Sequence, residues 1–315
     1  MRDGKAPGGE NGGPLLTARE LSVEFSLYRK GLSQTRLTAV RSLSLDARRG
    51  EILAVIGSSG AGKSLLAGAI LGILPANALV KGELLYNGEV LTPASQRQYR
   101  GTEIVLIPQS VDYLDPLMRA GKQVAGARGD KKGQREAFKR YGLDPRAERM
   151  FPFQLSGGMA RRMLIAAAVI TKPQLIVADE PTAGLDGELA LETLRHFRQL
   201  ADGGAAILLI THDIDLALAA ADRIAVFYAG TVVEIAPAAD FRQGKAALRH
   251  PYSKALIDAL PGNAFTPITG TQPPPDHLPP GCLFADRCAG RRPACDGEIA
   301  PRALRGGEVK CLYAT

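Results

Sequence analysis

One eight-residue segment constrains this chain more than any other: Gly57-Ser58-Ser59-Gly60-Ala61-Gly62-Lys63-Ser64. It matches the pattern of a phosphate-binding loop, directly after the apolar run Glu51 to Ile56 and directly before an apolar helix that begins at Lys63. Glycines at this spacing let backbone N–H groups turn toward phosphate oxygens, and the helix N-terminus adds positive potential. We expect Lys63 to reach the β- and γ-phosphates of a nucleotide and the Ser64 hydroxyl to ligate Mg²⁺. A Gly/Ser-rich turn that only caps a helix is the alternative.

The runs around this loop indicate an α/β fold. Apolar runs such as 103–107, 175–178 and 206–210 predict strands, and 160–170 and 189–200 predict helices between or after them. Strands that alternate with helices favour a parallel sheet with both faces covered.

The composition is that of an ordinary globular protein, with 45% hydrophobic and 23% charged residues in 315. The longest apolar run, Leu65 to Leu74, is too short to span a bilayer. Residues 1–14 are polar and Gly-rich, so we expect a disordered tail rather than a signal peptide or anchor.

A second candidate site lies at the end of the run Leu175 to Ala178, where Asp179 and Glu180 follow directly. A parallel strand carries its C-terminal residues to the edge at which α/β proteins bind ligands. We expect Asp179 to bind Mg²⁺ through water and Glu180 to orient and deprotonate an attacking water. Two carboxylates at a strand-to-loop junction are common on any surface, and the loop upstream is what favours catalysis.

Positive charge is concentrated between residues 119 and 149, which hold ten Lys/Arg against four Asp/Glu in a chain of net charge +7. Helix-forming residues separate these charges and aromatics are almost absent, which favours a solvated helical face over a nucleic-acid surface. Proximity to anionic lipid headgroups stays open if the segment docks on a membrane partner.

Between the two candidate sites stands Leu155-Ser156-Gly157-Gly158-Met159, followed by a helix. It resembles the signature motif of the ABC ATPases, with Met159 where the family usually has Gln. A Ser hydroxyl and Gly amides at a helix N-terminus suit an anion. The resemblance implies that Ser156, Gly157 and Gly158 contact the γ-phosphate bound in the opposite subunit of a dimer. A plain Ser-Gly-Gly helix start is the alternative.

Further family elements follow in the expected order. Gln109 resembles the Q-loop glutamine, which senses Mg²⁺ and the membrane partner. Asp186 closes Ala183-Gly184-Leu185-Asp186, which resembles the D-loop although the usual Ser-Ala start is replaced. His212 resembles the switch histidine at the γ-phosphate. Phe25 resembles the aromatic that stacks on adenine, with Tyr28 as a possible substitute, and a core aromatic would look the same.

The resemblance implies a P-loop NTPase fold: a RecA-like parallel core, an N-terminal antiparallel β subdomain and an inserted helical subdomain. We expect an ATPase domain over residues 15–245, with the helical part at about 110–160, and a C-terminal extension over 246–315. The implied activity is hydrolysis of ATP to ADP and phosphate with Mg²⁺, coupled to membrane transport. The implied place is the cytoplasmic face of the plasma membrane, against two permease subunits and a second, paralogous ATPase, and no nucleic acid.

Three segments resemble the oligopeptide/dipeptide/nickel importer branch: Asp115 to Met118, His250 to Leu256 and the cysteine-bearing segment from Gly281 to Cys288. The branch implies an extracytoplasmic substrate-binding protein as an indirect partner. The short stretch between Gly121 and Tyr141 is more like nickel-type members, so the cargo, peptide or nickel chelate, stays open.

All four cysteines, Cys282, Cys288, Cys295 and Cys311, lie in a short tail after a Pro-rich segment. A cytosolic compartment disfavours disulfides. Zinc prefers tight C-x2-C knuckles, whereas iron–sulfur clusters tolerate wider loops and need four thiolates. Some members of the branch carry a [4Fe–4S] cluster on a similar tail, so we expect a cluster here, with zinc or free thiols as alternatives.

Two other functions could use a phosphate-binding loop. A non-transport ABC ATPase acting on nucleic acid or ribosomes usually carries tandem cassettes, long coiled coils or zinc insertions, which this sequence lacks. An unrelated P-loop kinase or GTPase gives no reason for the segment Leu155 to Met159. The sequence therefore favours the importer ATPase.

Overall fold

The computed structural model describes residues 13–28, 34–58, 60–126 and 129–315. The tail expected over residues 1–14 lies almost entirely outside this range, and the first strand already begins at Pro14. The strands are β1 (Pro14–Tyr28), β2 (Gln34–Arg48), β3 (Ile52–Ile56), β4 (Ala78–Tyr86), β5 (Glu89–Val90), β6 (Ile104–Ile107), β7 (Leu175–Asp179), β8 (Ala206–Thr211), β9 (Arg223–Tyr228), β10 (Thr231–Pro237), β11 (Arg302–Leu304) and β12 (Gly307–Val309). The helices are α1 (Lys63–Leu71), α2 (Pro93–Tyr99), α3 (Ala120–Ala125), α4 (Lys131–Arg140), α5 (Gly157–Val169), α6 (Gly187–Asp202), α7 (Ile214–Ala220), α8 (Ala238–Arg242) and α9 (Pro251–Asp258).

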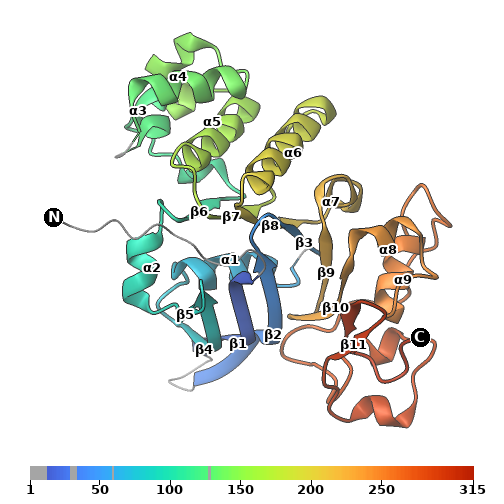
Figure 1. Cartoon of the computed structure of the whole chain (residues 1–315). Helices are drawn as coiled ribbons and strands as arrows, with labels where there is room; N and C mark the ends of the chain where they lie inside the picture. The colour runs from blue at the N-terminus through green and yellow to red at the C-terminus, as the bar shows by residue number, and fades with distance from the viewer. Residues whose placement is uncertain (1–12, 29–33, 59, 127–128) are drawn as a thin grey trace.

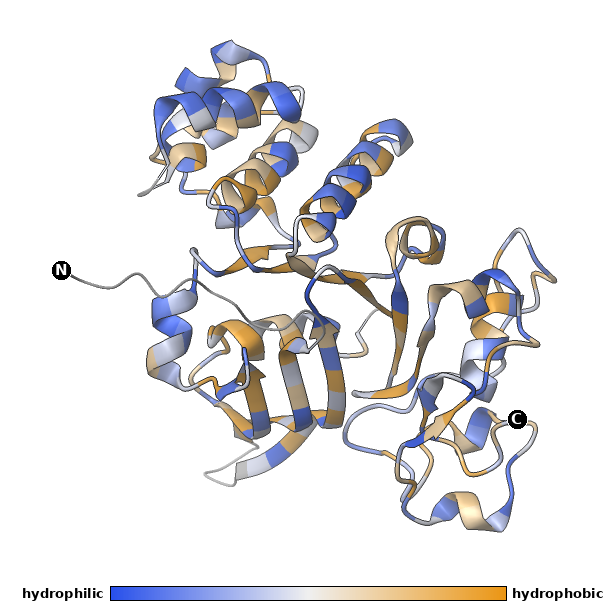
Figure 2. Ribbon diagram, in the orientation of Figure 1, coloured by the Kyte–Doolittle hydropathy of each residue, from blue (hydrophilic) through white to orange (hydrophobic). Residues whose placement is uncertain are grey.

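The central sheet has the order β11-β12-β10-β9-β3-β8-β7-β6. Its middle strands β9, β3, β8, β7 and β6 are parallel, and every residue of β3, β7 and β8 is buried. Continuous apolar runs form such strands because helices cover both faces of a parallel sheet. Figure 2 shows these strands as a hydrophobic centre. The expected parallel α/β core is confirmed.

A second, antiparallel sheet of order β2-β1-β4-β5 lies on one side of this core. Helix α1 lies between the two sheets, and its Leu66 and Ile70 share one apolar cluster with Leu21 of β1 and Val55 of β3. The helix that follows the phosphate-binding loop is therefore held from both sides.

The other face of the central sheet is covered by α5, α6 and the helices after β8. Helices α3 and α4 lie beyond the sheet edge and pack on α5, so that they form a helical lobe with it (Figure 1). The basic segment 119–149 falls largely on this lobe, where most of its charged side chains are exposed.

The C-terminal extension is built onto the central sheet. The hairpin β11–β12 pairs with β10, with Glu234 opposite Val309. Arg249 joins the core to the hairpin. Its buried guanidinium lies 3.3 Å from Glu234 of β10 and 2.7 Å from Asp240 of α8, and its Nε donates to the Leu304 carbonyl of β11. The extension thus shares the sheet of the core.

In the part of the chain that the structure describes, no helix is both long and apolar enough to cross a membrane.

Candidate nucleotide-binding site

The phosphate-binding loop leaves β3 and enters α1, as the sequence predicts. Gly57 packs so closely that a Cβ there would lie 2.2 Å from the Phe227 carbonyl oxygen. Gly62, at the start of α1, has φ of 100°, a conformation that side chains disfavour, and a Cβ would lie 3.0 Å from the Ala39 carbonyl. These two glycines are therefore required by the shape of the loop. Ser59 lies outside the described residues.

The Lys63 side chain folds back against the phosphate-binding loop. Its side chain is buried, and its Nζ donates to the carbonyls of Gly57 at 2.7 Å and Ser58 at 3.0 Å. Burial lowers the pKa of Lys63, while the nearby carboxylates Glu180 and Asp179 act to raise it. The ammonium therefore lies where the loop can present it to a phosphate.

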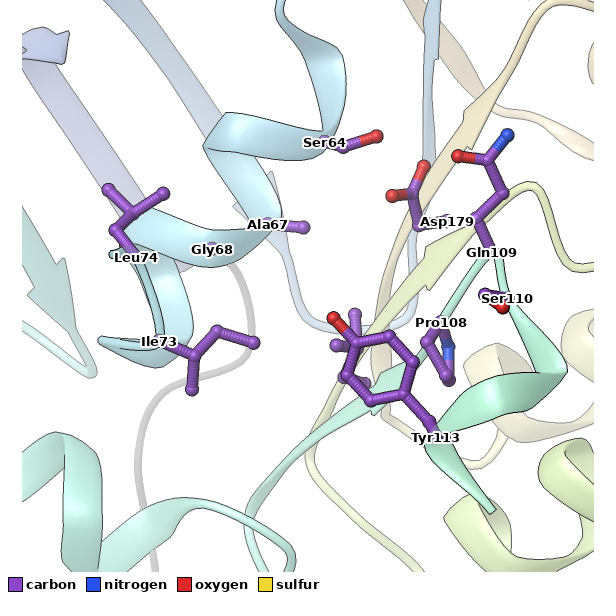
Figure 3. Close-up of a pocket in the computed structure, with 11 residues that line it drawn as sticks. Ser64, Ala67, Gly68, Ile73, Leu74, Pro108, Gln109, Ser110, Tyr113 and Asp179 are labelled. Carbon is purple, nitrogen blue, oxygen red and sulfur yellow. The ribbon is translucent and has the colours of Figure 1, made fainter. Parts of the chain in front are cut away.

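A cavity of about 550 Å³ lies beside the start of α1. Ser64 of α1, Asp179 at the end of β7 and Gln109 after β6 all line it, and Figure 3 shows their oxygen atoms facing the same space. Burial raises the pKa of Asp179 and neighbouring Glu180 raises it further, whereas a hydrogen bond with Ser64 and the charge of Lys63 act to lower it. A hydroxyl, a carboxylate and an amide oxygen are ligands that Mg²⁺ prefers, so the donor set fits this ion.

Glu180 and His212 lie in contact. The Glu180 Oε1 is 2.7 Å from His212 Nδ1 and accepts the His212 backbone N–H at 3.1 Å. The Thr211 hydroxyl donates to the other oxygen at 3.4 Å. Glu180 is 7% exposed and adopts φ of 50°, which is uncommon for a residue with a side chain. The surrounding structure fixes this carboxylate at the strand end beside the phosphate-binding loop.

Arg161 is a site residue that the sequence reasoning missed. It lies on α5, is 6% exposed, and donates to the carbonyls of Pro108 and Gln109. Burial lowers the pKa of its guanidinium, while Asp179 and Glu180 act to raise it. Arg161 thus ties the helix after the signature-like motif to the segment that carries Gln109. An arginine within an otherwise apolar predicted helix was the available sequence signal.

Ser156 and Asp186 lie at helix starts. The Ser156 hydroxyl accepts the Met159 N–H at 3.3 Å and caps α5, and Asp186 caps α6 by accepting the Leu189 N–H at 2.9 Å. Ser156 and Gly157 are exposed, and neither they nor Gly158 or Asp186 are among the described residues lining the cavity beside Ser64. The fold therefore does not bring the signature-like motif to the cavity of its own chain.

Phe25 lies in β1 opposite Leu37 and Ala78, half-buried against the apolar cluster of the antiparallel sheet. Its packing accounts for its position, and its adenine-stacking role stays a prediction. The Tyr28 side chain lies outside the described residues.

The four cysteines lie near one another. The Cys282 N–H donates to the Cys295 carbonyl at 2.8 Å. Burial raises the pKa of Cys282 to about 11, and the other three thiols, Cys311, Cys295 and Cys288, contribute to the rise. Within the described ranges, however, no group of three or more His, Cys, Asp or Glu side chains is arranged to hold a metal ion. The arrangement therefore gives no support for the expected cluster beyond the thiols' proximity.

The phosphate-binding loop, the acidic strand end and the parallel sheet together define a P-loop NTPase. Two family models match the chain: "ABC transporter" over residues 40–183 and "Oligopeptide/dipeptide transporter, C-terminal region" over residues 233–295. The dipeptide transport ATP-binding protein DppD of Bacillus subtilis is 36% identical, over 92% of this chain and 91% of that protein. The chain therefore belongs to the ABC transporter ATP-binding proteins, in the branch with the oligopeptide/dipeptide C-terminal region, and is an ATPase.

Two further comparisons agree. The oligopeptide transport ATP-binding protein OppD of Salmonella typhimurium is 33% identical, over 95% of this chain and 93% of that protein. A bacterial ABC transporter cassette solved as a dimer superposes with a TM-score of 0.62 at 25% identity, covering 71% of this chain and 98% of that one. The expected ABC ATPase fold and family are confirmed.

Proposed function

We propose that this chain is the ATPase subunit of an importer for short peptides. The observation that carries the proposal is that one chain joins an ABC ATPase segment to the oligopeptide/dipeptide C-terminal region. The relatives named above are dipeptide and oligopeptide transport proteins. This favours peptides over the nickel chelates that the sequence left open.

The residues at the loop have separate tasks. Backbone N–H groups of residues 57 to 64 bind the phosphates, and Lys63 binds the β- and γ-oxygens. Ser64, Asp179 and Gln109 would hold Mg²⁺, directly or through water, and the ion would neutralise charge on the phosphates. Gln109 also senses the membrane partner.

Glu180 accepts a proton from the attacking water, and His212 orients this carboxylate and contacts the γ-phosphate. The 2.7 Å contact between Glu180 and His212 supports this pairing. Because both residues follow neighbouring parallel strands, β7 and β8, the sheet fixes their separation.

ATP is sandwiched between two ATPase subunits. Ser156, Gly157 and Gly158 act on the nucleotide of the partner subunit, and Asp186 lies at the same interface. Ser156, Gly157 and Asp186 are exposed, and none of the four residues is in the described lining of the cavity beside Ser64, which supports an action across a dimer. The second ATPase is a paralogue. Phe25 stacks on adenine.

The complex lies at the cytoplasmic face of the plasma membrane. Two permease subunits form the path of the peptide across the membrane, and an extracytoplasmic binding protein delivers the peptide to them.

Affinity purification of the tagged chain from detergent-solubilised membranes should recover two multi-span proteins and a second ATPase. Recovery with ribosomes or nucleic acid instead would favour the non-transport alternative.

We further propose that Cys282, Cys288, Cys295 and Cys311 bind one [4Fe–4S] cluster with a structural role. Four thiols near one another in a Pro-rich segment match the donor number that such a cluster needs. Anaerobically purified protein should be brown and hold about four irons per chain. Stoichiometric zinc without iron would overturn the cluster, and protein without metal would leave ordinary thiols.

A further inference from the structure

A residue of the C-terminal extension reaches the phosphate-binding loop. The Ser58 hydroxyl donates to Gln272 Oε1 at 2.8 Å, and the same oxygen accepts the Ala229 N–H at 3.4 Å. A cavity of about 380 Å³ lies at this contact, and both Ser58 and His212 line it together with Gln272. The Pro-rich segment is therefore part of the wall beside the nucleotide site.

The position of Gln272 is fixed by the segment before it. Arg287 donates to the Thr269 carbonyl at 2.8 Å and to the Ile268 carbonyl at 3.3 Å. Gly270 then turns with φ of 71°, and a Cβ there would lie 3.5 Å from the Arg287 side chain. The chain after this turn is directed to the loop.

Arg287 is itself held by the cysteine-bearing tail. Its guanidinium lies 5.8 Å from the ring centroids of both Tyr228 and Phe284, within the range of cation–π attraction. Its Nη1 also lies 3.3 Å from the Tyr228 hydroxyl. Because Arg287 stands between Cys282 and Cys288, its side chain connects the cysteine loop to the backbone at Ile268 and Thr269, a few residues before Gln272.

Ser58 has a second neighbour in the same extension. Burial raises the pKa of Tyr252 on α9, while hydrogen bonding with Ser58 acts to lower it. The Ser58 carbonyl meanwhile accepts from Lys63 Nζ at 3.0 Å and from the Ala61 N–H at 3.3 Å. Holding Ser58 therefore holds one side of the phosphate-binding loop.

We infer that Gln272 is a positioning residue for the phosphate-binding loop, by which the C-terminal extension sets the affinity for ATP. The inference rests on the proposed nucleotide site. A loop that is already held in shape loses less conformational freedom when a nucleotide binds. The Gln272 side chain accepts hydrogen bonds from Ser58 of the loop and from Ala229 and, among the described residues, makes none with the catalytic carboxylate of Glu180, so it acts on binding rather than on the chemical step.

The test is a double-mutant cycle in the full-length chain, with ATP affinity measured by equilibrium binding and turnover measured in the assembled complex. Gln272→Leu removes the acceptor and Ser58→Ala removes the donor. Each should weaken ATP binding and raise KM by roughly 2- to 10-fold, the scale of one net hydrogen bond, with kcat within about twofold. The double variant should be no worse than either single variant.

Gln243→Leu is the matched control, because it makes the same substitution at an exposed glutamine, just after α8 and outside the phosphate-binding loop. It should leave ATP affinity unchanged. An unchanged or lower KM in both Gln272→Leu and Ser58→Ala, or fully additive effects, would overturn the inference. Lys63→Ala separates the two hypotheses: if it does not weaken ATP binding, the proposed nucleotide site itself is wrong.

Discussion

Glu180 is held in place before any substrate arrives. Its carboxylate is buried and contacts His212 and Thr211, and its backbone N–H donates to the Ile210 carbonyl of β8 at 2.9 Å. This fixed position suits the general-base role that we propose for Glu180, because a carboxylate already held by a neighbouring strand needs little reorganisation when water attacks the γ-phosphate.

Glu180→Gln should therefore leave ATP affinity near wild type and lower turnover by roughly two to four orders of magnitude, the scale of a lost general base. The amide keeps the shape of the carboxylate but cannot accept the proton. Equilibrium binding and steady-state hydrolysis in the assembled complex measure the two effects. Wild-type turnover in this variant would rule out Glu180 as the base.

At the residue scale, sequence reasoning works where chemistry is local. The glycines and Lys63 could be predicted because eight consecutive residues specify the loop and its place between strand and helix. Arg161 and Gln272 could not, because their partners lie 52 to 53 and 214 residues away in the chain. Neither a buried arginine in a helix nor a glutamine among prolines indicates which distant carbonyl or hydroxyl it meets.

At the element scale, the ion pair of Arg249 and Glu234 joins β10 to the C-terminal hairpin. The two side chains are 1% and 0% exposed, and Glu234 also accepts the backbone N–H groups of Arg249 and His250. This accounts structurally for part of the motif around His250. From the sequence, these residues indicated a family branch but no contact.

Arg249→Met should lower the free energy of unfolding by about 3–5 kcal/mol, because it leaves the Glu234 carboxylate buried without its partner. Lys245→Met is the control: Lys245 is exposed and its partner Asp258 is only partly buried, so loss of this ion pair should cost less than about 1 kcal/mol. Denaturant titration measures both variants. Equal effects would contradict the structural role of the buried pair.

His250 makes folding sensitive to acid. It is buried at the start of α9, where its Nδ1 accepts the Tyr252 N–H at 3.0 Å. Burial lowers the pKa of His250 from 6.5 to about 3, and Lys254 contributes. The unfolded chain binds a proton near pH 6.5 that the folded chain does not bind until about pH 3. Its contribution to stability is thus complete above pH 6.5 and lost as the pH falls.

His250→Asn should keep the helix cap and remove this proton. The loss of unfolding free energy between pH 7 and pH 5 should then be smaller than in the wild type by about 2 kcal/mol. Denaturant titrations at the two pH values measure it. An identical pH dependence in both proteins would mean that His250 is not buried in its neutral form.

At the scale of the whole molecule, the proposed function gives each chain half of a composite nucleotide site. The cavity beside Ser64 belongs to the sheet and α1, whereas Ser156 lies exposed at the start of α5. The alternation of strands and helices predicted the sheet, because each element buries a face that its neighbours must cover. The joining of the C-terminal hairpin to β10 could not be predicted, since its strands are three residues each and follow a Pro-rich segment.

Ser156→Arg should leave ATP binding by the isolated chain near wild type, because the side chain does not line its own cavity. In the assembled complex it should abolish hydrolysis at the composite site, where a bulky cation displaces the hydroxyl and amides. Nucleotide binding to the isolated chain and turnover of the complex give the two readings. Loss of ATP binding by the isolated variant would show that the motif acts within its own chain.

The central claim, that this chain drives peptide import, is tested most directly by measuring dipeptide transport in proteoliposomes. In vesicles whose ATPase subunits face outward, the outside solution corresponds to the cytoplasm. With ATP outside and the binding protein and labelled dipeptide in the lumen, the purified complex should move the dipeptide out of the vesicle, which is the import direction. Transport should require ATP and should fail with Lys63→Ala, which lacks the ammonium that binds the phosphates. ATP-driven movement of nickel without peptide, or peptide movement unaffected by Lys63→Ala, would contradict the account.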